Sequence, residues 1–281
     1  MSISTRPYEG PDDLRLMQQL CVEAWPSQWH VGDLAWDRFH RAGHEPEWRT
    51  TLWLEEGRCV AWAWFRQPEG ELAFLVHPKR RELTAEVVLK EDARSTSALA
   101  EDTQTVAVLE RAGYVATTAD EPFMVRLVRD LADLVDPVLE QGYELRHSPE
   151  LAARVAVHRA AWEPSRLTEE SYANVMRAWP YRADLDCVVV APDGSLAAFC
   201  LAWLDRENGV GEFEPVGTHP DHRRRGLATA VSTYALHRLR EAGAHTAVVY
   251  ARGDAAYPAA KLLYESLAFV QHVRTRTFTH P

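Results

Sequence analysis

The chain has 281 residues, 46% of them hydrophobic and 26% charged, and a formal net charge of −10. This composition excludes disordered and fibrous proteins, and the length predicts two domains of ordinary size. The acidic balance opposes nonspecific binding to nucleic acid or to an anionic membrane. The sequence has no basic leader with an apolar core and no membrane-spanning apolar run, so we expect a cytoplasmic protein.

The first half alternates strands and helices. In chain order we expect a strand over 3–8, a helix from Asp12, a tryptophan-rich helical stretch, strands over 48–56, 59–65 and 71–77, a helix, a strand near 96–100, a helix from Thr103 and a strand over 122–128. Pro137 and Gly142 then mark a linker within 131–143.

The second half repeats that order. We expect a strand over 143–148, helices from Glu150 and Thr168, a hairpin over 187–204, a strand over 211–220, a helix over 227–242, a strand over 245–251, a helix from Pro258 and a strand over 269–278. Two echoes support a duplication: AFLVHPKRREL at 73–83 with PVGTHPDHRRR at 215–225, and VAVLERAGY at 106–114 with KLLYESLAF at 261–269. We therefore expect two similar domains, 1–135 and 136–281.

The cysteines argue against a metal site and against disulfides. Cys21, Cys59, Cys187 and Cys200 are widely spaced and form no CxxC pair. We expect free, buried thiols and no bound metal. Cys187 and Cys200 lie in predicted strands without an evident histidine and acid partner, which disfavours a covalent cysteine intermediate.

Residues 211–220, GEFEPVGTHP, predict a strand that separates from a neighbour. Strand alternation places Glu212, Glu214, Val216 and Thr218 on one face. Pro215 cannot donate to a ladder, so the strand must bulge or part there. The gap would offer unpaired backbone to an extended polar ligand.

The turn that follows, DHRRRGLA at 221–228, predicts an anion site. A helix N-terminus presents unpaired amides, and Arg223, Arg224 and Arg225 add positive charge. The spacing is neither that of a P-loop nor that of a dinucleotide fingerprint. The alternative is a solvated basic turn that caps a helix.

A tyrosine on the last predicted helix is a candidate acid. In YPAAKLLYESLAF, Tyr257, Ala260 and Tyr264 share one helical face. A tyrosine there could protonate a leaving group, with simple packing as the alternative.

Together these features resemble the GNAT superfamily of acyl-CoA-dependent N-acetyltransferases, whose motif R/Q-x-x-G-x-G/A follows a strand ending V-x-P. Here Arg223-Arg224-Arg225-Gly226-Leu227-Ala228 follows Thr218-His219-Pro220. The resemblance implies an α/β fold of two tandem GNAT domains, each a mixed, mostly antiparallel sheet flanked by helices, with acetyl-CoA as cosubstrate. It assigns the pantetheine arm to backbone groups of Val216, Gly217 and Thr218. It assigns the pyrophosphate to the residues that follow: Arg223, Arg224, Arg225, Gly226, Leu227, Ala228 and Thr229.

The resemblance also implies catalytic residues. The family pattern N-x-x-A-x-x-L-Y-x-x-x-G-F matches at Ala260, Leu263, Tyr264 and Phe269. Tyr264 is then the general acid. Tyr257 stands where Asn is usual and Ala268 where Gly is usual, so the cosubstrate contact at Tyr257 departs from the pattern. Glu212 has the position of the family's general base, and Glu214 is the alternative base.

The first half lacks these residues. Thr84 replaces the glycine, Glu86 stands where a small residue should face a pyrophosphate, and Leu109 replaces the tyrosine. We expect no CoA site there, and a role in walling the acceptor cleft. A degenerate first unit before a working second unit is similar to the arrangement in the mycothiol synthase family.

The resemblance implies direct transfer of an acetyl group to the amine of a small-molecule acceptor. Trp162, Trp179 and Tyr181, in the two helices before the hairpin, are candidate acceptor contacts. We expect a monomer or homodimer without nucleic-acid or membrane partners. The alternatives are a non-catalytic acyl-CoA sensor or scaffold, a mycothiol synthase, and a nucleic-acid-binding module at the HRRR run, which the acidic balance disfavours.

Overall fold

The computed structural model describes residues 2–41, 43–118 and 122–280. The first half has strands β1 (Ile3–Pro7), β2 (Trp48–Glu55), β3 (Arg58–Arg66), β4 (Glu71–Val76), β5 (Ser95–Leu99), β6 (Val115–Ala116) and β7 (Met124–Asp130). Its helices are α1 (Pro11–Ala24), α2 (Val31–Phe39), α3 (Thr84–Val88) and α4 (Thr103–Arg111).

The second half follows in the same order. Its strands are β8 (Glu144–His147), β9 (Asp186–Val190), β10 (Leu196–Asp205), β11 (Val210–Thr218), β12 (Thr246–Arg252) and β13 (Val270–Thr279). Its helices are α5 (Leu151–Ala161), α6 (Glu169–Arg177), α7 (Leu227–Glu241) and α8 (Pro258–Ser266). The predicted succession of helices and strands is confirmed in both halves.

One continuous sheet joins the two halves. Its strand order is β1-β2-β3-β4-β5-β13-β7-β12-β11-β10-β9-β8, with β6 beside β13. The β4–β5 and β11–β12 pairs are parallel, while the other pairs are antiparallel, for example β10–β11 and β2–β3. The fold is therefore α/β with a mixed, mostly antiparallel sheet and flanking helices, as expected.

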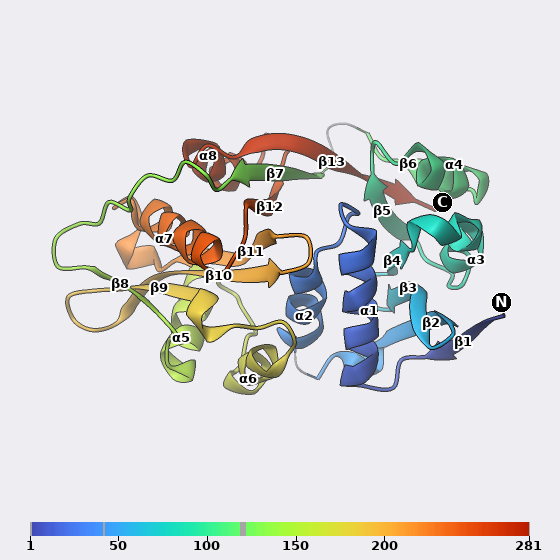
Figure 1. The fold of residues 1–281 in the computed structure, drawn as a ribbon, viewed down its shortest axis with the longest axis horizontal. Helices are drawn as coiled ribbons and strands as arrows, with labels where there is room; N and C mark the ends of the chain where they lie inside the picture. The colour runs from blue at the N-terminus through green and yellow to red at the C-terminus, as the bar shows by residue number, and fades with distance from the viewer. Residues whose placement is uncertain (1, 42, 119–121, 281) are drawn as a thin grey trace.

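The halves exchange their last strands. β7, the last strand of the first half, pairs along its length with β12 of the second half. β13 pairs with β7 over residues 270–274 and with β5 over residues 275–279. In Figure 1, β13 (red) runs from the lobe that holds α8 to the lobe that holds β5 and the C-terminus. Each lobe thus contains a strand that belongs, in sequence, to the other half.

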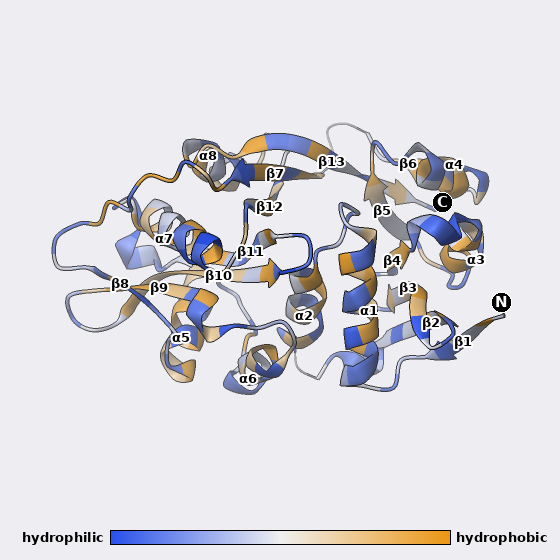
Figure 2. Cartoon of the chain, in the orientation of Figure 1, coloured by the Kyte–Doolittle hydropathy of each residue, from blue (hydrophilic) through white to orange (hydrophobic). Residues whose placement is uncertain are grey.

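Two helical layers cover the first-half sheet. Strand alternation on β3 directs Trp62 and Trp64 toward the α1 side, where Met17 packs, and Phe65 toward the α3 side, where Val87 packs. In the second half, apolar β9 and β10 lie between α7 on one face and α5 on the other, as the orange residues in Figure 2 show. Burial on both faces explains the near-continuous apolar sequences of these strands.

Helix α2 belongs to both lobes. Its Trp36 packs in one cluster with Val155, Tyr172 and Trp203 of the second half. A Cβ atom built on Gly32, near the start of the helix, would lie 2.3 Å from Cγ of Trp203. The glycine therefore permits the close approach of the two halves.

The cysteines Cys21, Cys59, Cys187 and Cys200 are buried free thiols, which confirms the expectation. Among the residues that the structure describes, no helix is both long and apolar enough to cross a membrane.

Candidate functional site

Strands β11 and β12 separate beside a run of free backbone. They pair only over residues 210–212 of β11 and 246–248 of β12. β11 keeps its other partner, β10, as far as Thr218. The predicted separation of this strand from a neighbour is confirmed. Val216, Gly217 and Thr218 consequently turn one backbone edge toward a gap, where an extended ligand with amide groups can pair.

A bulge at Glu214 and Pro215 changes which side chains share a face. Cys200 of β10 faces Val216 and Ala202 faces Phe213, so two residues of β11 stand opposite one of β10. Val216 therefore packs with Phe213 on the α7 side, whereas Glu214 lines cavities formed with the first half. The extra residue reverses the strand alternation beyond the bulge. The expectation that Glu212, Glu214, Val216 and Thr218 share one face was therefore wrong for the residues after the bulge.

The turn before α7 presents a cradle of amides. Arg224 and Gly226 adopt left-handed conformations, with φ of 59° and 73°. The chain then enters α7, and the amide of Ala230 is the first to bond backward, to the carbonyl of Gly226 at 2.9 Å. The N–H groups of residues 224–229 have no acceptor in the part of the chain that the structure describes. Consecutive free amides at a helix N-terminus form an anion site.

The arginine side chains at this turn are exposed and partly engaged. Arg223 donates from Nη2 to the carbonyl of Ala161 at 3.2 Å, and Nη1 of Arg225 lies 2.8 Å from Oε1 of Glu140. Leu227 is buried and anchors the start of α7, while Ala228 and Thr229 lie in its first turn. The amides therefore form the inner wall of the anion site, and the guanidinium groups surround it.

Tyr264 of α8 is buried in the α7-side core, with its ring centre 5.7 Å from that of Phe269. Burial, followed by the charges of Cys200 and Glu214, raises the pKa of Tyr264 well above its usual value. The phenol therefore stays protonated and can act as an acid. Tyr257, by contrast, is half-exposed at the N-terminus of α8, where the guanidinium carbon of Arg252 lies 5.8 Å from its ring centre.

Glu212 lies at the junction of the two halves. It is 1% exposed, and its Oε2 atom lies 3.1 Å from Nδ1 of His30. Nδ1 accepts the Gly32 amide at 3.2 Å, and Nε2 lies 3.3 Å from the Val210 carbonyl, which assigns the histidine proton to Nε2. Burial lowers the pKa of His30 and raises that of Glu212 to about 8. Near pH 7, Glu212 is mostly a neutral acid beside a neutral imidazole.

Glu214 stands between two cavities that both halves form. One, of about 660 Å³, is lined in part by Asp33, Asp37, Arg41, Arg66, Tyr250 and Arg252. The other, of about 530 Å³, is lined in part by Trp36, His40, His158, Trp162 and Arg166. Glu214 and Arg41 border both cavities. Burial and then the neighbouring Glu212 raise the pKa of Glu214.

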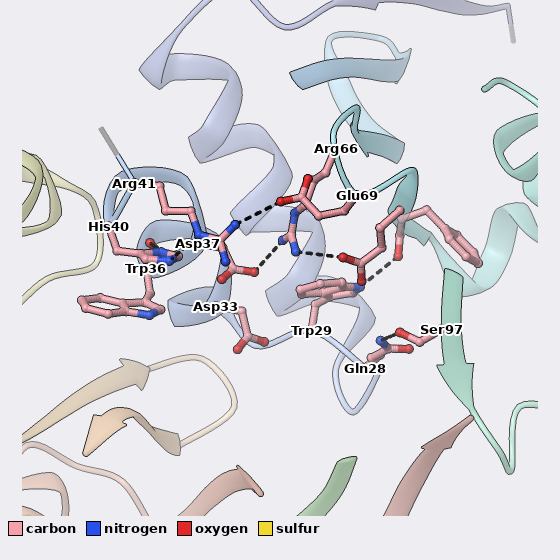
Figure 3. Close-up of polar contacts among 12 residues, drawn as sticks. Gln28, Trp29, Asp33, Trp36, Asp37, His40, Arg41, Arg66, Glu69 and Ser97 are labelled. Carbon is pink, nitrogen blue, oxygen red and sulfur yellow. Dashed lines mark hydrogen bonds and ion pairs between the residues drawn. The ribbon is translucent and has the colours of Figure 1, made fainter. Parts of the chain in front are cut away.

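Charged residues of the first half face the larger cavity (Figure 3). Nη2 of Arg66 lies 2.7 Å from Oδ2 of Asp37, and its Nη1 lies 3.4 Å from Oε2 of Glu71. Arg41 lies 3.4 Å from Glu69. Within the described ranges no cation lies within 4.0 Å of the carboxylates of Asp33 or Glu214, so these two acids are available to a basic ligand.

Sequence reasoning missed these first-half residues. Asp33, Asp37 and Arg41 follow one another at intervals of four, which places them on one face of α2 and its extension. That polar stripe was a usable signal. Nothing local in the sequence showed that the stripe faces Glu214 more than 170 positions away.

The candidate acceptor residues take different places. Trp162, which follows α5, is 47% exposed and lines the 530 Å³ cavity with Glu214. Trp179 follows α6 and packs on α1, with the guanidinium carbon of Arg15 4.9 Å from its ring centre. Tyr181 is partly buried against Trp203 and donates to Asp186 at 3.3 Å. Only Trp162 of the three lines a cavity beside Glu214.

Two strands of the first half separate in the same way, but side chains of the α1–α2 loop contact the backbone there. β4 and β5 pair only over residues 71–72 and 95–96. Nε1 of Trp29 donates to the carbonyl of Phe74 at 2.9 Å, and Nε2 of Gln28 donates to Oγ of Ser97 at 3.1 Å (Figure 3). In the repeat alignment Phe74 corresponds to Val216. The α1–α2 loop thus occupies backbone that the second half leaves free.

The first-half turn also offers fewer amides. The N–H of Thr84, which corresponds to Gly226, donates to the carbonyl of Arg81, and α3 has only five residues. Oε1 of Glu86 accepts a hydrogen bond from Nε1 of Trp53 at 2.6 Å, and Leu109 is fully buried. A cavity of about 600 Å³ lies beside this turn.

Residues 153–269 match the sequence model of the acetyltransferase (GNAT) family. The chain is also similar to mycothiol acetyltransferases from Streptomyces griseus (31% identity over 147 residues, 50% of this chain and 47% of the relative) and from Kineococcus radiotolerans (35% over 180 residues, 58% and 57%). The matched region thus spans about half the length of these curated relatives.

Solved structures with the same fold cover almost the entire chain. A tandem GNAT protein from the clavulanic acid biosynthesis pathway superposes with a TM-score of 0.65 and 18% identity, over 99% of this chain and 98% of its own. A GNAT-family acetyltransferase from Colwellia psychrerythraea gives a TM-score of 0.65 and 13% identity, over 99% and 100%. At these identities the likeness concerns the fold alone.

Proposed function

We propose that the chain transfers an acetyl group from acetyl-CoA to the amine of a small-molecule acceptor. The match of residues 153–269 to the acetyltransferase (GNAT) family supports this proposal. The free amides of residues 224–229 carry this proposal, since they lie beside the open backbone edge of Val216, Gly217 and Thr218. Pyrophosphate fits the first feature and the amide-bearing pantetheine arm fits the second. In the first half the turn offers fewer amides and the α1–α2 loop occupies the open backbone, so we propose one cosubstrate site per chain.

In the proposed reaction the acceptor amine enters a cavity beside Glu214. Glu212, through a water molecule, or Glu214 directly takes a proton from the amine. The nitrogen attacks the thioester carbon, whose oxygen is polarised by a backbone amide near Val216. The carbon–sulfur bond then breaks, and Tyr264 gives its proton to the departing thiolate, so CoA leaves as the thiol.

The acceptor is proposed to be a polar amine bound by both halves. Arg41, Arg66, Asp37 and Glu71 provide charged groups of both signs around the 660 Å³ cavity. Asp33 and Glu214 add acids whose pKa burial raises. The amine that mycothiol acetyltransferases acetylate is one candidate, because the similar relatives carry that name. A diffuse polar cavity without a cationic or anionic bias favours screening of zwitterionic and hydroxylated amines first.

Calorimetric titration with acetyl-CoA tests the cosubstrate site. We expect one site per chain, loss of binding in Ala228→Glu, which places a carboxylate in the first turn of α7, and retention in Ala107→Glu, which adds the same charge to exposed α4. Two sites would show that the first half also binds. Absence of binding would refute the proposal, and binding without turnover of any amine in a broad panel would favour the sensor alternative.

A further inference from the structure

A cavity of about 690 Å³ lies in the first half, apart from the two that Glu214 borders. It forms where the β1–α1 connection, the end of α2 and the start of β2 meet. Tyr8, Phe39 and Trp48 contribute aromatic walls, and Pro7, Pro11 and Pro46 contribute apolar rings. None of the proposed catalytic residues lines it.

A buried cation lies at this cavity. Arg38 is 5% exposed, and its guanidinium carbon lies 3.8 Å from the ring centre of Tyr8, 5.2 Å from that of Trp48 and 5.0 Å from that of Trp64. Nη1 donates to Oγ1 of Thr50 at 3.1 Å. Over residues 2–41, 43–118 and 122–280, no carboxylate lies within 4.0 Å of this guanidinium. Burial lowers the pKa of Arg38, and the hydroxyl of Tyr8 and the more distant charge of Glu45 offset this effect only in part.

A buried arginine of the second half pairs with a carboxylate. Arg154 is fully buried and also stacks on a ring, with its guanidinium carbon 3.9 Å from the centre of Phe199. Its Nε atom, however, lies 2.9 Å from Oδ1 of buried Asp186. Ring faces repay only part of the cost of removing a guanidinium from water, and a carboxylate supplies the rest. Arg38 has the rings without the carboxylate.

The rim of the cavity restricts which anion can enter. Glu9, Glu45 and Glu91 line it, and each has a contact of its own: Glu9 with Arg6 at 3.8 Å, Glu45 with the amide of Gly43 at 3.0 Å, and Glu91 with Arg49 at 2.9 Å. These carboxylates repel a dianion such as phosphate more than a single carboxylate. The apolar walls add affinity for a ligand with a hydrophobic body.

We propose that this cavity binds a small carboxylic acid with an apolar body, whose carboxylate pairs with the guanidinium of Arg38. The carboxylate would occupy the place that Asp186 has beside Arg154. The ring or chain of the ligand would lie against Tyr8, Phe39 and Trp48. The site is separate from acetyl transfer, so its existence does not depend on the proposed enzymatic activity.

Titration of the full chain with benzoate tests the site, with benzamide as the neutral isostere and inorganic phosphate as an anion without an apolar body. Binding is followed by tryptophan fluorescence, to which Trp48 and Trp64 contribute, and by the thermal midpoint. We expect saturable benzoate binding in the millimolar range, at least about 10-fold weaker binding of benzamide, which corresponds to about 1.4 kcal/mol, and weaker binding of phosphate.

Variants then locate the binding. Arg38→Met should abolish the benzoate response, whereas Arg49→Met at the rim and Arg41→Met in the acceptor cavities should retain it. Equal responses to benzoate and benzamide in the wild type would overturn the proposal, as would benzoate binding that survives Arg38→Met. If Arg38→Met does not fold, Thr50→Val, which removes the hydrogen bond from Arg38 Nη1 to Oγ1 of Thr50, should weaken benzoate binding several-fold. Unchanged binding would count against the site.

Discussion

Tyr264 is buried in the α7-side core and its pKa is raised, so in the proposed mechanism it donates a proton rather than accepting one. We expect Tyr264→Phe to lower kcat by about 10²-fold or more, the usual contribution of a general acid, and to leave acetyl-CoA affinity unchanged. Steady-state rates and calorimetry measure the two quantities. Tyr234→Phe, which is partly buried against the same core, is the matched control. An unchanged kcat would remove Tyr264 from the mechanism.

The pH dependence of the rate distinguishes Glu212 from Glu214 as the proposed base. If Glu212, with a pKa of about 8, is the base, kcat/KM should rise with pH and level off above about pH 8. Glu212→Gln should lose that rising limb and most of the rate. Glu214→Gln should keep the rising limb of the pH profile and should raise KM for the acceptor amine. The reverse pattern would assign the base to Glu214, and two unchanged profiles would exclude both.

Glu212 also predicts how stability depends on pH. Its pKa is about 8 in the folded chain against a usual 4.5, so between these values the folded state holds a proton that the unfolded state has lost. The free energy of unfolding therefore falls as pH rises through this window, by about 1.4 kcal/mol per pH unit from this group. Glu212→Gln should remove that part of the slope in urea unfolding, whereas Glu207→Gln, which is exposed, should not. Parallel slopes for wild type and Glu212→Gln would contradict the assignment.

At the scale of elements, the sequence predicted what is local. Turn chemistry and residue periodicity gave the order of helices and strands, and Pro215 correctly indicated the separation of β11 from β12. The bulge at Glu214 and Pro215 could not be placed, because its position depends on the partner strand, and it reversed the side of Val216. Strand partners beyond hairpins are likewise non-local, so the pairing of β7 with β12 had no sequence signal.

That strand exchange makes a prediction about fragments. A chain of residues 136–281 lacks β7, so β12 and β13 would each lose a partner and expose unpaired edges. We expect this fragment to aggregate, and a fragment of residues 122–281, which retains β7, to be more soluble and to bind acetyl-CoA. Size-exclusion chromatography and calorimetry compare them. A monomeric, binding-competent 136–281 fragment would show that the exchanged strand is dispensable.

At the scale of the whole molecule, the α1–α2 loop joins the halves through buried polar contacts. Arg126 donates to the carbonyl of Ser27 at 2.7 Å, Tyr250 donates to that of Gln28 at 2.7 Å, and His30 lies beside Glu212. The same loop contacts the separated strands of the first half and borders the 660 Å³ cavity. In the proposed function, the first half, which lacks the motif of residues 223–228, therefore forms one wall of the acceptor site. This role follows only from the relative placement of distant segments, which the sequence did not reveal.

Substitution of Gly32 tests whether the close contact between the two halves is required for stability. Alanine normally favours a helix by about 1 kcal/mol over glycine, but a Cβ atom here would lie 2.3 Å from Cγ of buried Trp203. We expect Gly32→Ala to lower the free energy of unfolding by about 1–3 kcal/mol, because overpacking must displace the indole or part the halves. Gly10→Ala is the control, since no atom lies within 4 Å of its Cβ position. Urea unfolding measures both variants. If Gly32→Ala proved as stable as the wild type, α2 and β10 would have room to move apart. The shape of the 660 Å³ cavity would then be adjustable rather than fixed by the contact between the two halves.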